Sequence, residues 1–187
     1  MKYSVKEFDA HLLKKYPSYL KSFENLSRDD DKNSVTNSQI QAFDFDKITS
    51  NKFKSADALF FCNIDDSIYF IEFKNKPEKN IKSKDIRLKA IESVIALGVL
   101  LEKENLIQKR NEIFCNFQMY LMIVFSLEKN EQDKNIIDIE LRKRLENSES
   151  FNLERYEGII FKKTYTVPNN IFEKQLEKCF IFGNWEF

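Results

Sequence analysis

The stretch from Ala56 to Asn75, ADALFFCNIDDSIYFIEFKN, indicates a β-hairpin. Its two arms, Ala56 to Ile64 and Ile68 to Phe73, are short and nearly continuous apolar runs rich in Phe and Ile. Runs of this length and composition are typical of buried strands. The pair Asp65-Asp66 lies between the arms, and Asp is a frequent turn residue. We therefore expect two antiparallel strands joined at this acidic pair.

Two charged residues, Glu72 and Lys74, stand at the end of the second arm. Successive side chains of a strand alternate between its faces, so these two share a face, about 7 Å apart at the backbone. A two-residue turn would pair Ile64 with Ser67 and hence Asp57 with Lys74. That register brings Asp57, Glu72 and Lys74 to one face, whereas a slip of one residue would turn Asp57 to the other face.

Two carboxylates and an ammonium at one end of an apolar hairpin are costly to remove from water unless their charge is compensated. A hard divalent cation would compensate it. Mg²⁺ takes one or two protein carboxylates and keeps waters that can contact phosphate oxygens or supply an attacking hydroxide. A neighbouring lysine can position that water or offset charge that develops on the phosphate. The hairpin therefore predicts a site for phosphodiester chemistry.

These residues resemble the PD-(D/E)xK phosphodiesterase superfamily, which includes restriction-endonuclease-like enzymes and many repair and defence nucleases. The resemblance rests on Asp57, on Glu72-Phe73-Lys74 fifteen residues later, and on the long helix expected after them. It covers residues 4–126 at the level of element order. It implies a metal-dependent nuclease in which Asp57 and Glu72 hold Mg²⁺ or Mn²⁺. The backbone carbonyl of Phe73 would be a further ligand, and Lys74 would assist the attacking water.

The resemblance also implies a third acidic position, and the sequence departs from the family pattern at one residue. Members of the superfamily often add an acidic residue from the first helix, and Glu24 is preferred here over Glu7 as that metal ligand. Ala56 stands where the family name has proline. The chain has one other acid-x-lysine triplet, Asp30-Asp31-Lys32, but it lies in a polar segment. Only Glu72-Phe73-Lys74 is embedded in an apolar strand, which is why Glu72 is the candidate site residue.

A basic segment follows the hairpin, although the whole chain has thirty basic and thirty acidic residues. The zero net charge argues against affinity based on a generally basic surface. From Lys74 to Lys89, seven Lys or Arg outnumber Glu78 and Asp85. The segment is either a solvated loop and helix start or a nucleic-acid contact surface. The candidates for phosphate contacts are Lys76, Lys84, Arg87 and Lys89.

The remaining patterns predict an α/β protein with a mixed central β-sheet flanked by helices. One domain is expected over 1–187, with a core of order αβββαβ over about 4–126 and C-terminal additions over about 127–187. Helices are expected over 4–26 with a break at Pro17, from the N-cap Ser83 to about 101, over 136–145 and over 170–179. Besides the hairpin, strands are expected over 40–48 and 118–126, and either a strand pair or one long strand over 156–167.

Several other classes of protein are excluded by composition. The sequence has no run of about eighteen apolar residues and no apolar signal-peptide centre, so we expect a soluble cytoplasmic protein without a membrane partner. Cys62, Cys115 and Cys179 are widely spaced and flanked by apolar residues, which indicates core positions. His11, the only histidine, lies in a helical apolar pattern, so a structural role is expected. Three scattered glycines exclude a phosphate-binding glycine loop.

Two functions remain open. One is the nuclease, acting on DNA or RNA. The other is a non-catalytic module of the same fold, which binds nucleic acid or a protein partner as a subunit or immunity-type protein. A homodimer is compatible with either function. The sequence does not decide between DNA and RNA, because base readout depends on loops that it does not place.

Overall fold

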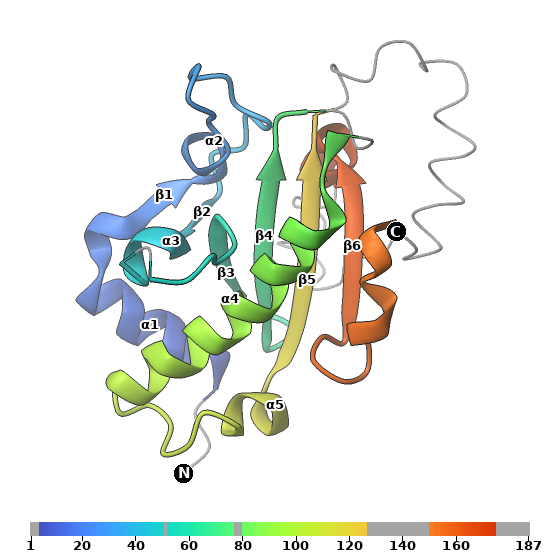
Figure 1. The fold of residues 1–187 in the computed structure, drawn as a ribbon. Coiled ribbons are helices and arrows are strands. Elements are labelled where there is room, and N and C mark those ends of the chain that lie inside the picture. Colours follow the sequence, from blue (N-terminus) through green and yellow to red (C-terminus); the bar gives the residue numbers. More distant parts are fainter. Residues whose placement is uncertain (1–3, 51, 77–79, 127–149, 175–187) are drawn as a thin grey trace.

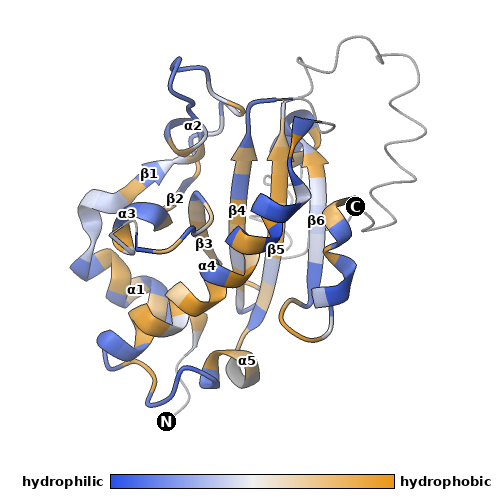
Figure 2. Cartoon of the chain, viewed as in Figure 1, coloured by the Kyte–Doolittle hydropathy of each residue, from blue (hydrophilic) through white to orange (hydrophobic). Residues whose placement is uncertain are grey.

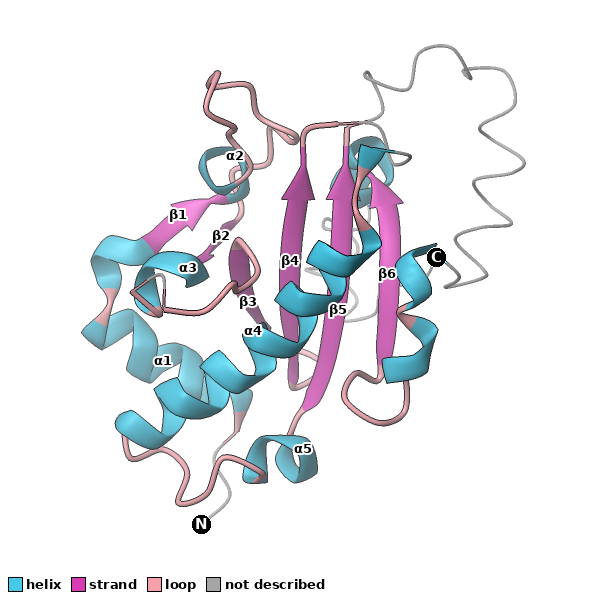
Figure 3. Ribbon diagram, viewed as in Figure 1, coloured by secondary structure: helices cyan, strands magenta, loops and turns pink. Residues whose placement is uncertain are grey.

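The computed structural model describes residues 4–50, 52–76, 80–126 and 150–174. Its centre is a six-stranded sheet with the strands in chain order (Figures 1 and 3). The first four strands pair antiparallel, whereas the last two run parallel to the fourth. The strands are β1 (Leu20–Ser22), β2 (Gln41–Asp44), β3 (Ala58–Cys62), β4 (Ser67–Lys74), β5 (Gln118–Phe125) and β6 (Lys163–Pro168).

Helices flank this sheet, so the expected α/β class with a mixed sheet is confirmed. The longest helix, α4, connects β4 to the parallel strand β5 and crosses the sheet in front of it in Figure 1. Residues 169–174 are also helical. The helices are α1 (Val5–Lys15), α2 (Phe23–Leu26), α3 (Phe45–Ile48), α4 (Ser83–Lys103) and α5 (Glu112–Asn116); single 3₁₀ turns are η1 (Pro17–Tyr19), η4 (Ser150–Asn152) and η5 (Glu154–Tyr156).

The sheet has an apolar core on each face, because nearly all residues of its central strands are buried. Figure 2 shows the hydrophobic stretches along β4 and β5. Ile68 and Phe70 of β4 belong to the core that α1 and α4 cover. Phe73 belongs to the other core, where its ring packs edge-on against Phe23 of α2 and Phe172. Since side chains alternate along β4, Glu72 follows Ile68 and Phe70 on the α4 face.

The hairpin has a different turn from the one we expected. Cys62 pairs with Ser67, so the loop contains four residues, Asn63–Asp66, and Asp57 falls opposite Glu72 by extension of this register. Asp66 adopts a left-handed backbone conformation (φ 54°), and its carboxylate accepts a hydrogen bond from the Val5 N–H. The acidic pair therefore forms the second half of a longer turn. The shift of two residues leaves Asp57 on the expected face.

Other element boundaries also differ from the sequence predictions. The strand expected over 40–48 ends at Asp44, whose carboxylate caps α3 by accepting from the Lys47 N–H. The helical pattern over 4–26 is interrupted by η1 and β1, and Lys82 rather than Ser83 is the N-cap of α4. The strand expected over 156–167 begins only at Lys163. The helix expected over 136–145, and positions 175–179 of the last one, lie outside the described residues.

Two further expectations concern the membrane and the cysteines. No helix in the described part of the chain has the length and apolarity needed to span a membrane. Cys62 is buried in the core on the face opposite α4, as expected for a core residue. The side chain of Cys115 and all of Cys179 lie outside the described part of the structure.

Candidate functional site

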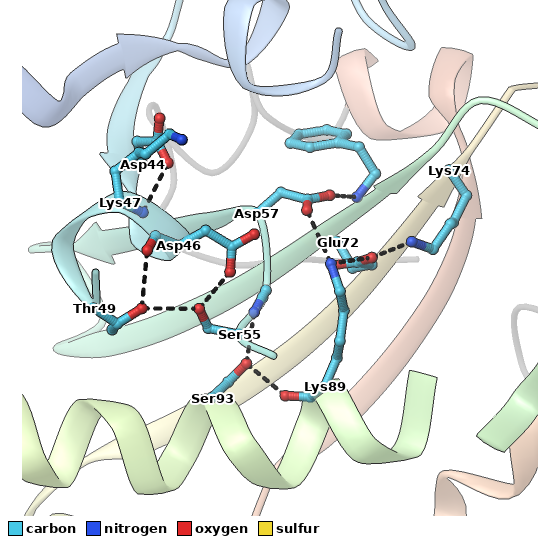
Figure 4. A network of polar contacts seen from close by, with 12 residues as sticks. Asp44, Asp46, Lys47, Thr49, Ser55, Asp57, Glu72, Lys74, Lys89 and Ser93 are labelled. Carbon is cyan, nitrogen blue, oxygen red and sulfur yellow. Dashed lines mark hydrogen bonds and ion pairs between the residues drawn. The ribbon is translucent and has the colours of Figure 1, made fainter. Parts of the chain in front are cut away.

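Four charged side chains meet where the end of β4 passes the start of β3 and the first turns of α4 (Figure 4). Glu72 comes from β4 and Asp57 from the residue directly before β3. Lys74 ends β4, and Lys89 comes from α4. The Glu72 side chain is 1% exposed, whereas those of Asp57, Lys74 and Lys89 are 20–24% exposed. The cluster is therefore buried at Glu72 and open to solvent at its rim.

The two carboxylates share one ammonium group. Lys89 Nζ lies 3.1 Å from Asp57 Oδ1 and 2.8 Å from a Glu72 carboxylate oxygen. Within this cluster, Lys74 Nζ pairs with Glu72 Oε1 and not with Asp57. The second oxygen of Asp57, Oδ2, accepts a 2.7 Å hydrogen bond from the Phe73 N–H. The structure thus brings Asp57, Glu72 and Lys74 together and adds Lys89 between the acids.

The environment shifts the proton affinity of two of these groups. Burial, and then the negative charge of Asp57, raise the pKa of Glu72 to about 7, although Lys74 and Lys89 oppose the shift. Burial would lower the pKa of Lys89, but the charges of Asp57 and Glu72 outweigh it and raise the pKa above its ordinary value. Lys89 is therefore positively charged, and Glu72 changes its protonation near neutral pH.

The backbone of Phe73 also faces the site. Its N–H donates to Asp57 on the β3 side of β4, whereas the carbonyl of Lys74 accepts from the Ser126 N–H on the β5 side (3.1 Å). Carbonyl groups of successive strand residues point to opposite edges of the strand. The Phe73 carbonyl therefore points to the side on which Asp57 lies.

Hydrogen bonds from α4 fix the start of β3. Ser93 Oγ accepts from the Ala56 N–H at 2.8 Å and donates to the Lys89 carbonyl at 2.6 Å (Figure 4). Ser93 is fully buried. One side chain thus ties the residue before Asp57 to the helical turn that carries Lys89.

A third acid, Asp46 of α3, lies beside the cluster. Its carboxylate accepts from Ser55 Oγ at 2.5 Å, and Ser55 also bonds Thr49 Oγ1 at 3.2 Å. The pKa of Asp46 is raised, chiefly by burial, although the hydrogen bond from Ser55 and the charge of Lys89 oppose the shift. Asp46 therefore lies close enough to Asp57 and Lys89 to interact with them electrostatically, while its carboxylate is hydrogen-bonded to Ser55 (Figure 4).

The acidic residue of the first helical region is not brought to this site. Glu24 pairs with Arg28 and Gln39, and α2 packs its Phe23 on the face opposite Glu72. Glu7 forms a capping box with Ser4 at the start of α1. Val5, two residues before Glu7, donates its N–H to the Asp66 carboxylate. Asp66 is six residues before Glu72, which is roughly 20 Å at the usual rise per strand residue, so Glu7 starts far from Glu72. In the structure Glu24 and Glu7 therefore have other partners, and neither joins the cluster at Glu72.

The four basic candidates separate into two groups. Lys76 and Lys84 are exposed and Arg87 is half-buried, around the end of β4 and the first turns of α4. Lys89, expected on the same surface, instead contacts both carboxylates. The reason is helical periodicity: Lys89 is next to Ala90 and three residues from Ile86, both buried, so it borders the stripe that faces the sheet.

The donor atoms suit a hard cation. Within the described ranges, no three His, Cys, Asp or Glu side chains are placed to hold a metal ion. The site instead offers two carboxylates and the Phe73 carbonyl, an all-oxygen set of the kind Mg²⁺ and Mn²⁺ accept when water and phosphate oxygens fill the remaining positions. The Lys89 ammonium already lies between the carboxylates, which indicates that a positive charge is accommodated there.

Sequence reasoning missed Lys89 as a member of the cluster, and it missed Asp46. The signal for Lys89 was its place beside the buried stripe of α4, but the sequence does not say which border of the stripe faces Glu72. The signal for Asp46 was its place just after β2, since Asp44 pairs with Ala58 at the start of β3. Adjacent antiparallel strands bring these ends together.

A second charged cluster lies between α1 and the end of α4. The Glu104 side chain, 1% exposed, pairs with Lys15, accepts from Tyr16 Oη at 2.6 Å and lies 3.1 Å from His11 Nε2. Burial would raise the pKa of Glu104, but the hydrogen bonds from these three residues lower it to about 2. These contacts join two helices, in agreement with the structural role expected for His11.

Comparison with known proteins returned no relative: no family model matches the chain, and neither a curated protein nor a solved structure does.

Proposed function

We propose that the protein is a metal-dependent nuclease that hydrolyses phosphodiester bonds through a PD-(D/E)xK-type site formed by Asp57, Glu72 and Lys74. The observation that carries this proposal is the convergence of Asp57 and buried Glu72 from adjacent antiparallel segments, with lysines on the same face. The order of α1, the antiparallel strands β2 to β4, α4 and parallel β5 supports it, because the resemblance implies this order for the core.

The energetic cost of the cluster also supports a functional reading. A buried ion pair is weak evidence for stability, because apolar residues of similar volume often stabilise a fold equally well. Glu72 is a carboxylate in a strand whose residues from Ser67 to Phe73 are all buried. Perturbed ionisable groups at a partly open position are more frequent at functional sites than elsewhere.

The proposed chemistry divides between a cation and the chain. Mg²⁺ or Mn²⁺, when bound, would supply an activated water and a positive charge for the phosphate oxygens. Asp57 and Glu72, with the Phe73 carbonyl, would hold the ion. Lys74, which is 20% exposed on the face of Glu72, orients the attacking water or offsets charge on the phosphate oxygens.

The basic residues around the site would hold the substrate backbone. Lys76 and Lys84 are exposed near the end of β4 and the start of α4, and Arg87 lies one turn further along the helix. Lys and Arg at such a rim contact phosphates and fix the register of a nucleic acid without reading its sequence. The substrate class proposed is therefore nucleic acid, either DNA or RNA.

A cleavage panel tests this function. Plasmid DNA, single-stranded DNA and RNA are incubated with Mg²⁺, Mn²⁺ or a chelator, using the natural protein and Lys74→Met. We expect metal-dependent cleavage of at least one substrate and a loss of about 100-fold or more in Lys74→Met, since removal of one transition-state donor typically costs this much. Lys103→Met, at the exposed end of α4, is the matched control. Cleavage that persists in chelator or in Lys74→Met contradicts the proposal.

One observation favours a second candidate, the non-catalytic module. Lys89 lies between the two carboxylates and offsets part of their negative charge. In that case the cluster is a structural ion-pair network, and the basic rim binds nucleic acid or an acidic protein surface without cleaving it.

A further inference from the structure

We propose that the Lys89 ammonium is the resident counter-ion of the Asp57 and Glu72 carboxylates and competes with a divalent cation for that position. This inference deepens the proposed function and rests on its metal site. It assigns to Lys89 a role different from phosphate binding by the basic rim.

The contacts distinguish Lys89 from the other nearby lysine. Lys89 Nζ lies within 3.1 Å of one acid and 2.8 Å of the other, so it occupies the point where the two carboxylates converge. Among the described residues, Lys74 forms its ion pair with Glu72 and none with Asp57, and it lies at the rim of the cluster. A cation that bridges Asp57 and Glu72 must therefore take the place of the Lys89 ammonium, whereas Lys74 can remain beside it.

The fold allows Lys89 to leave that place. Its backbone is held by the hydrogen bond from Ser93 Oγ to the Lys89 carbonyl, one helical turn further along α4. Its side chain is 24% exposed, and a flexible four-carbon stem carries the ammonium group. The ammonium can thus turn to solvent, or to a phosphate oxygen at the rim, while α4 stays where it is.

The charges make the two cations alternatives. An ammonium and a divalent ion within a few ångströms of each other repel strongly in a partly buried site. Binding of the divalent ion therefore includes the loss of the contacts that Lys89 makes with both acids. Removal of the lysine charge removes this competition and should tighten metal binding.

A calorimetric titration of Mn²⁺ tests the inference on the full chain. The natural protein is compared with Lys89→Met and with Lys103→Met, which removes a lysine from the same helix at an exposed position away from the site. We expect Lys89→Met to bind Mn²⁺ about tenfold more tightly than the natural protein, within the usual range of coupling between two sites. Lys103→Met should bind as the natural protein does.

The possible outcomes separate this inference from the proposed function. If the natural protein binds Mn²⁺ and Lys89→Met binds it equally or more weakly, the competition is overturned and the metal site is left intact. Binding by Lys89→Met alone supports the competition and identifies the natural protein as the non-catalytic module. Absence of binding in both overturns the inference and the metal site together.

A second variant covers the case in which Lys89→Met fails to fold. Lys89→Gln removes the charge but keeps hydrogen-bond donors for the two carboxylates. Its melting temperature is measured with and without Mn²⁺. We expect a larger rise on metal addition than the natural protein shows; an equal or smaller rise overturns the inference.

Discussion

Glu72 combines almost complete burial with a position between two lysines, and its protonation is therefore linked to folding. Burial and the charge of Asp57 raise the pKa of Glu72 from 4.5 to about 7. The folded protein then holds this proton more tightly than the unfolded chain does. The stabilisation that results is complete below about pH 4.5 and is lost as the pH rises through 7.

Glu72→Gln tests this link between protonation and folding. The free energy of unfolding of the natural protein should fall between pH 5 and pH 8, with a contribution from Glu72 on the order of 1–3 kcal/mol. The variant, which has no group to titrate there, should lack that part of the decrease. Urea unfolding at several pH values measures it. An identical pH dependence in both proteins would show that Glu72 keeps its ordinary pKa.

At the scale of elements, Glu104 ties the end of α4 to α1 through a buried carboxylate. The hydrogen bonds from Lys15, Tyr16 and His11 lower the pKa of Glu104 to about 2, so the folded protein disfavours its protonation. The stabilisation from this group is present above about pH 4.5 and is lost as the pH falls towards 2. The direction is opposite to that for Glu72.

Glu104→Gln tests the connection between the two helices. We expect the variant to lose about 1–3 kcal/mol of unfolding free energy at pH 7, because Lys15 and Tyr16 lose their charged partner at a buried point. The difference from the natural protein should shrink as the pH is lowered below 4.5. Chemical denaturation at pH 7 and pH 3 gives both values. A constant difference at the two pH values would rule out the ionised carboxylate as its cause.

The hairpin shows how far the sequence leads at this scale. Apolar runs located both arms, and strand alternation placed Asp57, Glu72 and Lys74 on one face even though the turn proved two residues longer. The longer turn includes a contact between Asp66 and the Val5 N–H, which is far away in sequence and which the sequence pattern does not reveal. Lys89 could not be assigned for a similar reason: the packing of α4 on the sheet decides which border of its buried stripe meets Glu72.

At the scale of the whole molecule, the chain has no net charge, and the candidate phosphate contacts are confined to a small basic rim around the site. The thirty basic and thirty acidic residues leave no general attraction to phosphate. The rim consists of Lys76, Lys84 and Arg87, beside the end of β4. Binding of nucleic acid should therefore depend on few phosphate contacts.

Salt dependence tests this limited rim. With Ca²⁺ present to favour binding, the logarithm of the association constant should fall with the logarithm of salt concentration with a slope of roughly −2 to −3, as expected for about three phosphate contacts. Lys76→Met should reduce the slope by about 1. Fluorescence anisotropy with a labelled oligonucleotide measures both. A slope near zero, or one unchanged by the substitution, would remove Lys76 from the contact surface.

The most direct measurement of the central claim is the initial rate of nucleic-acid cleavage in Mg²⁺ or Mn²⁺ by Glu72→Gln and by Asp30→Asn. Asp30 belongs to the only other acid-x-lysine triplet and is exposed in a polar loop, so it is the matched control. If Asp57 and Glu72 jointly hold the catalytic cation, Glu72→Gln loses at least about 100-fold in rate while Asp30→Asn cleaves like the natural protein. Equal rates in all three proteins, with folding retained, would contradict the account.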